Sequence, residues 1–356
     1  MLTIAADLPS DLIWADDSEP GIRRRRAGSG FAYVRADGRP AGKLAVARIR
    51  ALAIPPAWTD VWICANDVGH IQATGRDARG RKQYRYHPTF RAHRESTKFA
   101  RLHEFGLLLP SIRKQVAEDV ASRGMTRDKV VATVVRLLEA TLVRVGNEEY
   151  ARANRSYGLT TLRDRHAHFS SDGLRLVFTG KHGSANSVKV QDKRLRRVVK
   201  QCQDLPGQVL FQYLDNDGQP CPVSSTDVNE YLREVSGMPI TAKDFRTWMG
   251  TLLATVALAA LPPPKSQRDA QRSVTRALDV VSDHLANTVA VCRASYVHPL
   301  VIESFTDGTL PARWERTSAR GSRLLVPEER KLVHLLRPRA RSRANGRAHT
   351  NGAHAA

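Results

Sequence analysis

Residues 126–143 read TRDKVVATVVRLLEATLV, and this stretch decides the fold class of the longer part of the chain. Its apolar residues recur three and four positions apart, as on one buried face of an α-helix. They are Val130, Val131, Val134, Leu137, Leu138 and Leu142. Thr126 is a suitable N-cap residue, and Gly146 follows the last apolar position. The stretch therefore predicts a core helix from Thr126 to Val143.

Helical spacing also predicts the structure of most other segments after residue 89. The expected helices span residues 92–104, 111–122, 193–202, 225–235, 242–261 and 266–285. Short apolar or alternating runs predict strands at 159–162, 166–169, 174–178 and 187–190. We therefore expect an α+β protein whose residues 89–329 form a mainly helical domain with a small antiparallel sheet.

The first 88 residues have a different pattern and are expected to form a small β-rich domain. The pair Asp37-Gly38 tolerates the positive φ angles of a tight turn. Two prolines, Pro55 and Pro56, end any helix that precedes them. Strands are predicted at residues 31–35, 61–64, 70–74 and 83–86.

The last of these strands follows a basic loop that contains Arg81 and Lys82. Polar and aromatic side chains alternate along it, so one face is polar and the other aromatic; they are Gln83, Tyr84, Arg85, Tyr86 and His87. Such a strand suits a DNA groove, where Arg, Lys and Gln reach phosphates and base edges. The ordinary alternative is an edge strand with solvated charges.

The charge of the chain indicates a polyanionic partner. The chain has 56 Lys and Arg residues, a formal net charge of +21 and a pI near 10.5. These residues are spread along the sequence, which favours a broad binding surface for nucleic acid first and an anionic membrane second. Residues 330–356 hold seven Arg or Lys and no acidic residue, and they are expected to form a disordered basic tail that adds DNA affinity.

Several other classes of protein are not indicated. The N-terminus lacks the pattern of a signal peptide, and the longest apolar run, residues 252–261, is shorter than a membrane span requires. We therefore expect a soluble, cytoplasmic protein that associates with the nucleoid. The four cysteines are far apart with no metal-ligand spacing, and no phosphate-binding P-loop is present, so no metal and no nucleotide cofactor is expected.

Tyr296, at the end of the stretch 287–296, is a candidate nucleophile. A tyrosine hydroxyl is a weak nucleophile at neutral pH, so nearby cations must stabilise the reacting centre. Arg144, Lys181 and Arg246 are the candidates for this role. Lys181 is predicted at the tip of a glycine-containing hairpin, a position that suits a general acid. Each residue also has an interpretation without a catalytic role. Tyr296 would be a half-buried tyrosine and Arg144 an arginine at a helix C-terminus. Lys181 would be a solvated lysine and Arg246 a basic residue in a first helical turn.

Several segments, in the same order along the chain, resemble one known family, the type IB DNA topoisomerases of the poxvirus-like and bacterial group. The resemblance covers about residues 20–300. The segments read RIR (48–50) with IPPAW (54–58), IQATG (71–75), GRKQY (80–84), RVGNEEY (144–150), GLTTL (158–162), FTGK (178–181), KDFRT (243–247) and NTVAVCRASY (287–296).

The resemblance implies an enzyme that nicks and reseals DNA without ATP or metal. Tyr296 is similar to the nucleophile that joins the 3′ phosphate, and Arg144 and Arg246 to the arginines that stabilise the phosphoryl charge. Lys181 is similar to the general acid. Asn287 stands where the poxvirus and nuclear enzymes carry a histidine that donates to a phosphoryl oxygen.

The resemblance also implies how the chain meets its partner, duplex DNA. Gln83, Tyr84 and Tyr86 are similar to DNA-contacting residues of the N-terminal domain, and Tyr150 to one in the catalytic domain. The protein is then expected to act as a monomer whose two domains close around DNA as a clamp. Binding to DNA should depend steeply on salt because of the charge.

Two alternatives stay open at this point. A tyrosine recombinase shares the Arg-Lys-Arg-Tyr arrangement, but such enzymes usually show His-x-x-Arg where this chain has Lys243-Asp244-Phe245-Arg246. Their N-terminal domain is also helical. A non-catalytic DNA-binding protein would explain the charge, but not the ordered catalytic segments.

Overall fold

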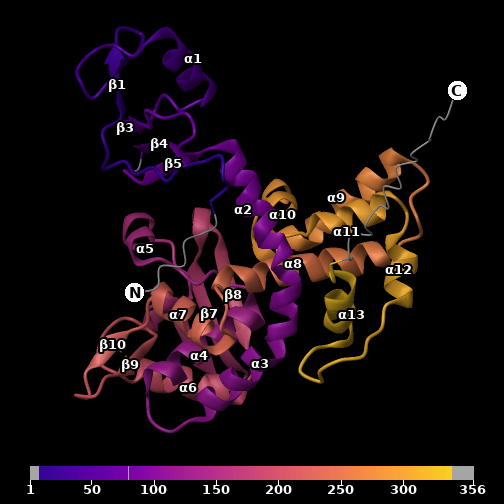
Figure 1. Ribbon diagram of the computed structural model, residues 1–356. Helices are drawn as coiled ribbons and strands as arrows, with labels where there is room; N and C mark the ends of the chain where they lie inside the picture. The colour runs from indigo at the N-terminus through magenta and orange to yellow at the C-terminus, as the bar shows by residue number, and fades with distance from the viewer. Residues whose placement is uncertain (1–7, 79, 339–356) are drawn as a thin grey trace, which may run out of the picture. The chain divides into compact units, whose positions relative to one another are not determined.

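The computed structural model describes residues 8–78 and 80–338, which divide into two compact units (Figure 1). The first unit holds the described part of residues 1–101, with Gly146–Thr161 and Phe178–Asn186. The second holds Leu102–Val145, Leu162–Val177 and the described part of residues 187–356. A small antiparallel sheet precedes a mostly helical region, which confirms the expected fold class. A domain boundary at residue 88 stays a prediction.

An antiparallel sheet with the strand order β2-β1-β3-β4-β5 forms the body of the first unit. Its strands are β1 (Ile22–Ala27), β2 (Gly30–Val34), β3 (Thr59–Ile63), β4 (Ile71–Arg76) and β5 (Lys82–Tyr86). Helix α1 (Lys43–Ala51) connects β2 to β3. Four of the five strands match predicted ones to within a few residues.

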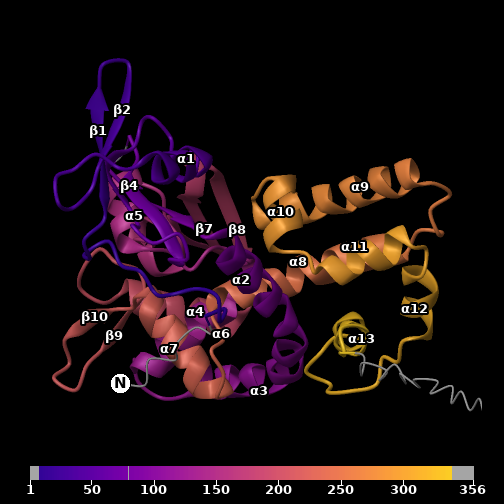
Figure 2. The same ribbon diagram turned by 45° about the horizontal axis from the view of Figure 1, so that its top comes forward.

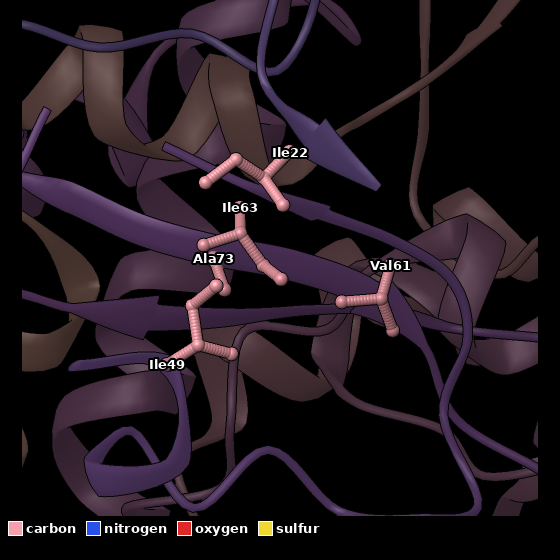
Figure 3. Close-up of a cluster of buried hydrophobic side chains, with 5 residues drawn as sticks. All are labelled: Ile22, Ile49, Val61, Ile63 and Ala73. Carbon is pink, nitrogen blue, oxygen red and sulfur yellow. The ribbon is translucent and has the colours of Figure 1, made fainter. Parts of the chain in front are cut away.

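The core of this sheet lies between α1 and one sheet face. Figure 3 shows its buried side chains, which come from α1 and from three strands: Ile22, Ile49, Val61, Ile63 and Ala73. Because successive side chains of a strand point to opposite faces, Trp62 points away from Val61 and Ile63. It is buried against Ala15 and Cys64 on the other face. Strand β3 is thus buried on both sides and anchors the sheet.

Strand β1 was not predicted, because its sequence, IRRRRA, carries four consecutive arginines. Ile22 enters the core, and Arg24 is half-buried. The Arg24 guanidinium donates to the carbonyl oxygens of Pro55 (3.1 Å) and Trp58 (2.5 Å) and lies 4.1 Å from the centre of the Phe31 ring. The burial of Arg24 among acceptors explains how a charged run forms an inner strand.

The first unit also contains short helical segments. They are α2 (Pro88–Ala100), α5 (Glu148–Asn154), η1 (Leu159–Thr161) and η3 (Lys181–Gly183). The predicted strand at 159–162 is wrong, because η1 is a 3₁₀ turn. Thr161 Oγ1 accepts from the Gly158 amide (2.9 Å) and donates to its carbonyl (3.0 Å). Such local hydroxyl bonds stabilise a turn in place of a strand ladder.

Helices dominate the second unit. They are α3 (Leu102–Ala121), α4 (Arg127–Thr141), α6 (Lys193–Gln203), α7 (Ser225–Ser236), α8 (Ala242–Ala259), α9 (Gln267–Leu285), α10 (Val289–Ser295), α11 (Pro299–Thr306), α12 (Leu310–Arg316) and α13 (Pro327–Leu335). Helices α6 to α9 match their predicted spans to within two residues.

Short strands accompany these helices. One sheet has the order β6-β7-β8, and a separate hairpin pairs β9 with β10. Their bounds are β6 (Ala167–Ser170), β7 (Gly173–Thr179), β8 (Ala185–Val190), β9 (Gln212–Leu214) and β10 (Pro220–Pro222). A 3₁₀ turn, η2 (Asp164–His166), precedes β6.

Helix α8 is central to the second unit. It packs against α3, α4 and α9, and against α11, α12 and α13 of the C-terminal region. Helices α8 and α9 lie side by side in both views, with α10 at one end of the pair (Figures 1 and 2). The buried residues of α8 include Phe245 and Trp248, which contact Phe105 of α3. Residues on α8 are therefore held by packing on several sides.

The expected helices at 92–104 and 111–122 have different boundaries in the structure. Helix α2 ends at its C-cap residue Arg101, and α3 begins at the next residue. Helix α3 then continues through Pro110. A proline inside a helix removes one backbone hydrogen bond. The buried face of α3, which includes Phe105, Leu109 and Ile112, continues on both sides of it. Packing of this face therefore outweighs the local cost of the proline.

The end of the predicted helix 126–143 also differs. Thr126 caps α4 as expected, since its side chain accepts from the Lys129 amide. Helix α4 ends, however, at Thr141, two residues before the predicted end at Val143, and its C-cap residue Leu142 adopts the left-handed conformation with φ 56°. A left-handed leucine is uncommon, because its side chain crowds the backbone. The backbone beyond α4 is therefore set by its surroundings.

The last described helix, α13, overlaps the segment expected to be a disordered tail. Residues 330–335 are helical, and Leu332, Val333 and Leu335 are buried. The other residues of that segment from 339 onward lie outside the described residues. None of the helices at residues 8–78 and 80–338 combines the length and apolar composition that crossing a membrane requires.

Candidate active site

Two helix C-termini meet in the second unit and hold three of the candidate residues. Helix α4 ends at Leu142 and α9 ends at Ala286, and both capping residues are left-handed, with φ of 56° and 45°. Their last carbonyl oxygens have no partner within their own helix and carry partial negative charge. Two arginines donate to these carbonyl groups.

Arg246 is the more deeply buried of the two arginines, with 4% of its surface exposed. Its Nη1 donates to the Leu142 carbonyl, and its Nη2 donates to the Leu285 carbonyl at 2.7 Å. A cation in the first turns of α8 is disfavoured by the dipole of its own helix. The C-terminal carbonyls of α4 and α9 offset this cost. The Nε of Arg246 is buried with no hydrogen-bond partner among the described residues.

Arg144 and Asn287 form a hydrogen-bonded pair beside this arginine. Arg144 Nη2 donates to the Ala286 carbonyl at 2.9 Å and to Asn287 Oδ1 at 2.5 Å. Asn287 Nδ2 donates weakly to the Leu285 carbonyl at 3.3 Å, and Ser282 Oγ donates to the Asn287 carbonyl at 2.6 Å. The asparagine is thus held in place and orients the Arg144 guanidinium.

Tyr296 is the C-cap residue of α10 and is half-buried. Its ring centre lies 5.2 Å from the guanidinium carbon of Arg246. Its carbonyl accepts from Thr251 Oγ1 at 3.3 Å, and its amide donates to the Cys292 carbonyl at 2.9 Å. The structure therefore brings Tyr296, Arg246, Arg144 and Asn287 together.

Three residues of this region were not predicted as part of the site. Gly250 and Thr251 of α8 approach the backbone of Tyr296, and Cys292 of α10 is fully buried. Burial raises the pKa of the Cys292 thiol, while the positive charges of Arg246 and Arg144 act in the opposite direction. The spacing of Gly250, one helical turn after Arg246, is the sequence signal that would have indicated this contact.

Lys181 belongs to the first unit and lies in the connection between β7 and β8, as predicted. The connection is closed by hydrogen bonds from the Gly180 amide to the Ser184 carbonyl (2.7 Å) and from Ser184 Oγ to the Lys181 carbonyl (3.1 Å). The Lys181 side chain is exposed. The turn that carries this exposed lysine is therefore held by its own hydrogen bonds.

The candidate DNA-binding residues of β5 divide into aromatic and polar sets, as the alternation predicted. Tyr84 and Tyr86 are 42% and 41% exposed, and their rings stack with centres 5.8 Å apart and an interplanar angle of 9°. Gln83, by contrast, donates to Asp77 Oδ2 at 3.0 Å. The exposed face of β5 is therefore an aromatic surface.

Acidic residues pair with the two basic candidates at the start of β5. Arg81 Nη2 lies 2.6 Å from Asp77 Oδ2, and the guanidinium carbon of Arg81 is 5.7 Å from the centre of the Tyr150 ring. Lys82 Nζ lies 2.8 Å from Asp17 Oδ2, and its hydrogen bond to this carboxylate lowers the pKa of Asp17. Contacts of these cations with phosphate would compete with both pairs.

Comparison with known proteins identifies the family. A family model described as eukaryotic DNA topoisomerase I, catalytic core, matches residues 87–320, and one described as bacterial DNA topoisomerase IB, N-terminal domain, matches residues 30–77. A DNA topoisomerase 1B of Acanthamoeba polyphaga mimivirus is 33% identical over 293 residues, which cover 80% of this chain and 87% of the relative. These matches favour a topoisomerase over a recombinase or a non-catalytic DNA-binding protein. The chain belongs to the type IB DNA topoisomerases and is an enzyme that acts on DNA.

Proposed function

We propose that the protein relaxes supercoiled duplex DNA by cutting one strand through a 3′-phosphotyrosine intermediate and resealing it. The oxygen of Tyr296 forms a bond to phosphorus while the bond from phosphorus to the 5′ oxygen breaks. Lys181 gives a proton to the departing 5′ oxygen, and the proton of the phenol passes to solvent water. In resealing, the 5′ hydroxyl attacks the phosphotyrosine and Tyr296 is released.

The single observation that carries this proposal is the arrangement of Arg246 beside Tyr296. The two terminal nitrogens of the guanidinium are anchored to helix carbonyls, while the buried Nε has no partner among the described residues. A buried unpaired donor is costly and calls for an explanation. A phosphoryl oxygen that binds next to the Tyr296 ring would accept this bond, and the fixed cation would stabilise the charge of the transition state.

Arg144 and Asn287 have complementary roles in the proposal. The Arg144 guanidinium, oriented by Asn287, adds a second positive charge for the phosphoryl oxygens. The amide of Asn287 donates to a phosphoryl oxygen, in exchange for its weak bond to Leu285. Neither step uses ATP or a metal ion, because one phosphate ester replaces another and arginines supply the charge.

We further propose that the aromatic face of β5 contacts DNA. The stacked, exposed rings of Tyr84 and Tyr86 and the high positive charge support this role. We propose that DNA is also contacted by Arg81, Lys82, Gln83 and Tyr150. Phosphate groups would then replace Asp77 and Asp17 as the partners of Arg81 and Lys82. The monomeric clamp also stays a prediction.

The polarity of the covalent bond tests the proposed chemistry. Linear duplexes labelled at their 5′ or 3′ ends are incubated with the protein, and the reaction is stopped with detergent. Label from the 5′ end should become attached to protein, and Tyr296→Phe should abolish this attachment. Tyr213→Phe, which changes another half-buried tyrosine, should leave it intact. Attachment of 3′ label, or attachment in Tyr296→Phe, would contradict the proposal.

A further inference from the structure

Helix α8 carries Arg246 and, one turn later, two residues that touch the backbone of Tyr296. We propose that Thr251 is a positioning residue for the nucleophile. We also propose that Gly250, which has no side chain, lets the backbone of Tyr296 pack directly against α8. The inference rests on the proposed role of Tyr296 and goes beyond it. It assigns the placement of the tyrosine to the same helix that holds the catalytic arginine.

The hydroxyl of Thr251 binds the backbone at Tyr296 and just after it. Thr251 is fully buried, and its Oγ1 donates to the Tyr296 carbonyl at 3.3 Å. The same oxygen accepts from the His298 amide at 3.1 Å. One hydroxyl thus satisfies a backbone acceptor and a backbone donor within three consecutive residues. Both bonds are partly buried, so the loss of the hydroxyl would cost free energy at the backbone of Tyr296 and His298.

Gly250 allows α8 to approach this backbone closely. A Cβ atom at Gly250 would lie 2.7 Å from the Tyr296 carbonyl oxygen and 3.1 Å from Tyr296 Cβ. The first of these distances is shorter than real Cβ contacts, so the backbone of Tyr296 would have to move. Any side chain at this position therefore displaces the nucleophile or the helix. Only glycine permits the observed contact.

The two contacts fix the distance between the nucleophile and the catalytic cation. Arg246 and Gly250 are four residues apart, so they lie on the same face of α8. Tyr296 packs over both, with its ring near the Arg246 guanidinium and its backbone against Gly250. A displacement of about 1 Å in a reacting group costs roughly 100-fold in rate. Thr251 therefore matters for the reaction without touching the DNA.

Thr255 provides a matched control one turn further along α8. It is also fully buried, but its Oγ1 donates to the Thr251 carbonyl at 2.6 Å, within its own helix. Thr251→Val and Thr255→Val therefore remove the same group from the same helix and from equally buried sites. Only the first change affects a contact with Tyr296.

The experiment measures single-turnover cleavage of duplex DNA by the full chain at saturating protein, together with DNA affinity and thermal unfolding. We expect Thr251→Val to cleave about 10- to 100-fold more slowly, with DNA affinity within about twofold of wild type. Thr251→Ser, which keeps the hydroxyl, should regain most of the rate. Gly250→Ala should be slowed as Thr251→Val is, and Thr255→Val should cleave at nearly the wild-type rate.

Three results would overturn the inference. They are equal rates for Thr251→Val and Thr255→Val, a failure of serine to restore the rate, and a rate loss matched by an equal loss of folded protein. Tyr296→Phe separates this inference from the proposed function. If Tyr296→Phe is inactive while Thr251→Val cleaves as the control does, only the positioning role is refuted. If Tyr296→Phe still cleaves, the nucleophile assignment is refuted as well.

Discussion

The contacts of Arg246 show how single residues build the site. This arginine joins the ends of α4 and α9 through its two terminal nitrogens, and its buried Nε has no hydrogen-bond partner among the described residues. The sequence segment 243–247 was enough to predict Arg246 as a candidate site residue. Its partners did not, because they depend on left-handed backbone at Leu142 and Ala286. Neither leucine nor alanine signals that conformation, and Gly146, which follows the predicted helix end at Val143, does not cap α4.

The proposed acid role of Lys181 predicts a leaving-group effect. Lys181→Ala should slow cleavage of a normal phosphodiester by about 100-fold or more, since no proton reaches the 5′ oxygen. A substrate with sulfur in place of that oxygen has a leaving group that needs no proton, and it should be cleaved at nearly the wild-type rate. Single-turnover cleavage of both substrates provides the measurement.

Lys189→Ala is the control for this prediction, because Lys189 is an exposed lysine on the same hairpin. It should leave both rates unchanged. Equal slowing of the two substrates by Lys181→Ala would remove the general-acid role and indicate a purely electrostatic one.

At the scale of elements, a buried ion pair attaches the C-terminal helix α13 to the rest of its unit. Glu329, which is 2% exposed, accepts two hydrogen bonds from Arg113 of α3 (2.7 and 2.8 Å) and one from Trp248 of α8 (3.1 Å). Burial opposes ionisation of Glu329, but the hydrogen bonds and charge of Arg113 outweigh it and lower the pKa. Helix α13 is thus tied to the helix that carries Arg246.

Glu329→Gln should therefore destabilise the protein by about 2 kcal/mol, because it removes the more deeply buried of the two carboxylates that pair with Arg113 and leaves only Glu139. The shift of the midpoint in denaturant-induced unfolding measures this change. Glu328→Gln alters the exposed neighbour on the same helix and should cost less than about 0.5 kcal/mol. Equal effects of the two substitutions would show that the buried pair adds nothing to stability.

The 3₁₀ turn η2 predicts a pH dependence of stability. His166 Nδ1 accepts from the Arg163 amide at 3.0 Å. Burial, together with the charges of Arg165 and Arg163, lowers the pKa of His166 from 6.5 to about 4. The unfolded chain thus binds a proton below about pH 6.5 that the folded chain binds only near pH 4. Stability from this group is present above pH 6.5 and is lost as the pH falls towards 4.

Replacing the histidine should flatten this part of the stability profile. In urea titrations from pH 7 to pH 4, His166→Gln should lose less stability on acidification than wild type does. His284→Gln, which changes an exposed histidine of α9, should keep the wild-type slope. A slope in His166→Gln as steep as in wild type would contradict the assignment.

The elements also show where sequence patterns succeed and fail. Regular apolar spacing with clear caps predicted α6 to α9 closely, since burial and capping agree there. Strand β1 was missed because the contacts that bury Arg24 come from residues more than 30 positions away. The predicted gap between the helices 92–104 and 111–122 is wrong for a similar reason, because tertiary packing of α3 outweighs the local cost of Pro110.

At the scale of the whole molecule, the sequence predicted the order of a small sheet followed by a helical region, and the structure confirms it. It did not show that Gly146–Thr161 and Phe178–Asn186, from the helical half of the sequence, belong to the first compact unit. Such long-range contacts leave no periodic signal. The net charge of +21 was accessible from composition alone and agrees with the family of DNA-acting enzymes.

The most direct test of the central claim is relaxation of a supercoiled plasmid by the full chain in EDTA without ATP. The wild-type protein should relax the plasmid, because Tyr296 and the cationic side chains carry out both strand cleavage and resealing. Tyr296→Phe should bind the plasmid with nearly unchanged affinity and relax none of it. Relaxation by Tyr296→Phe, or a requirement of the wild type for ATP or a divalent metal, would contradict the account.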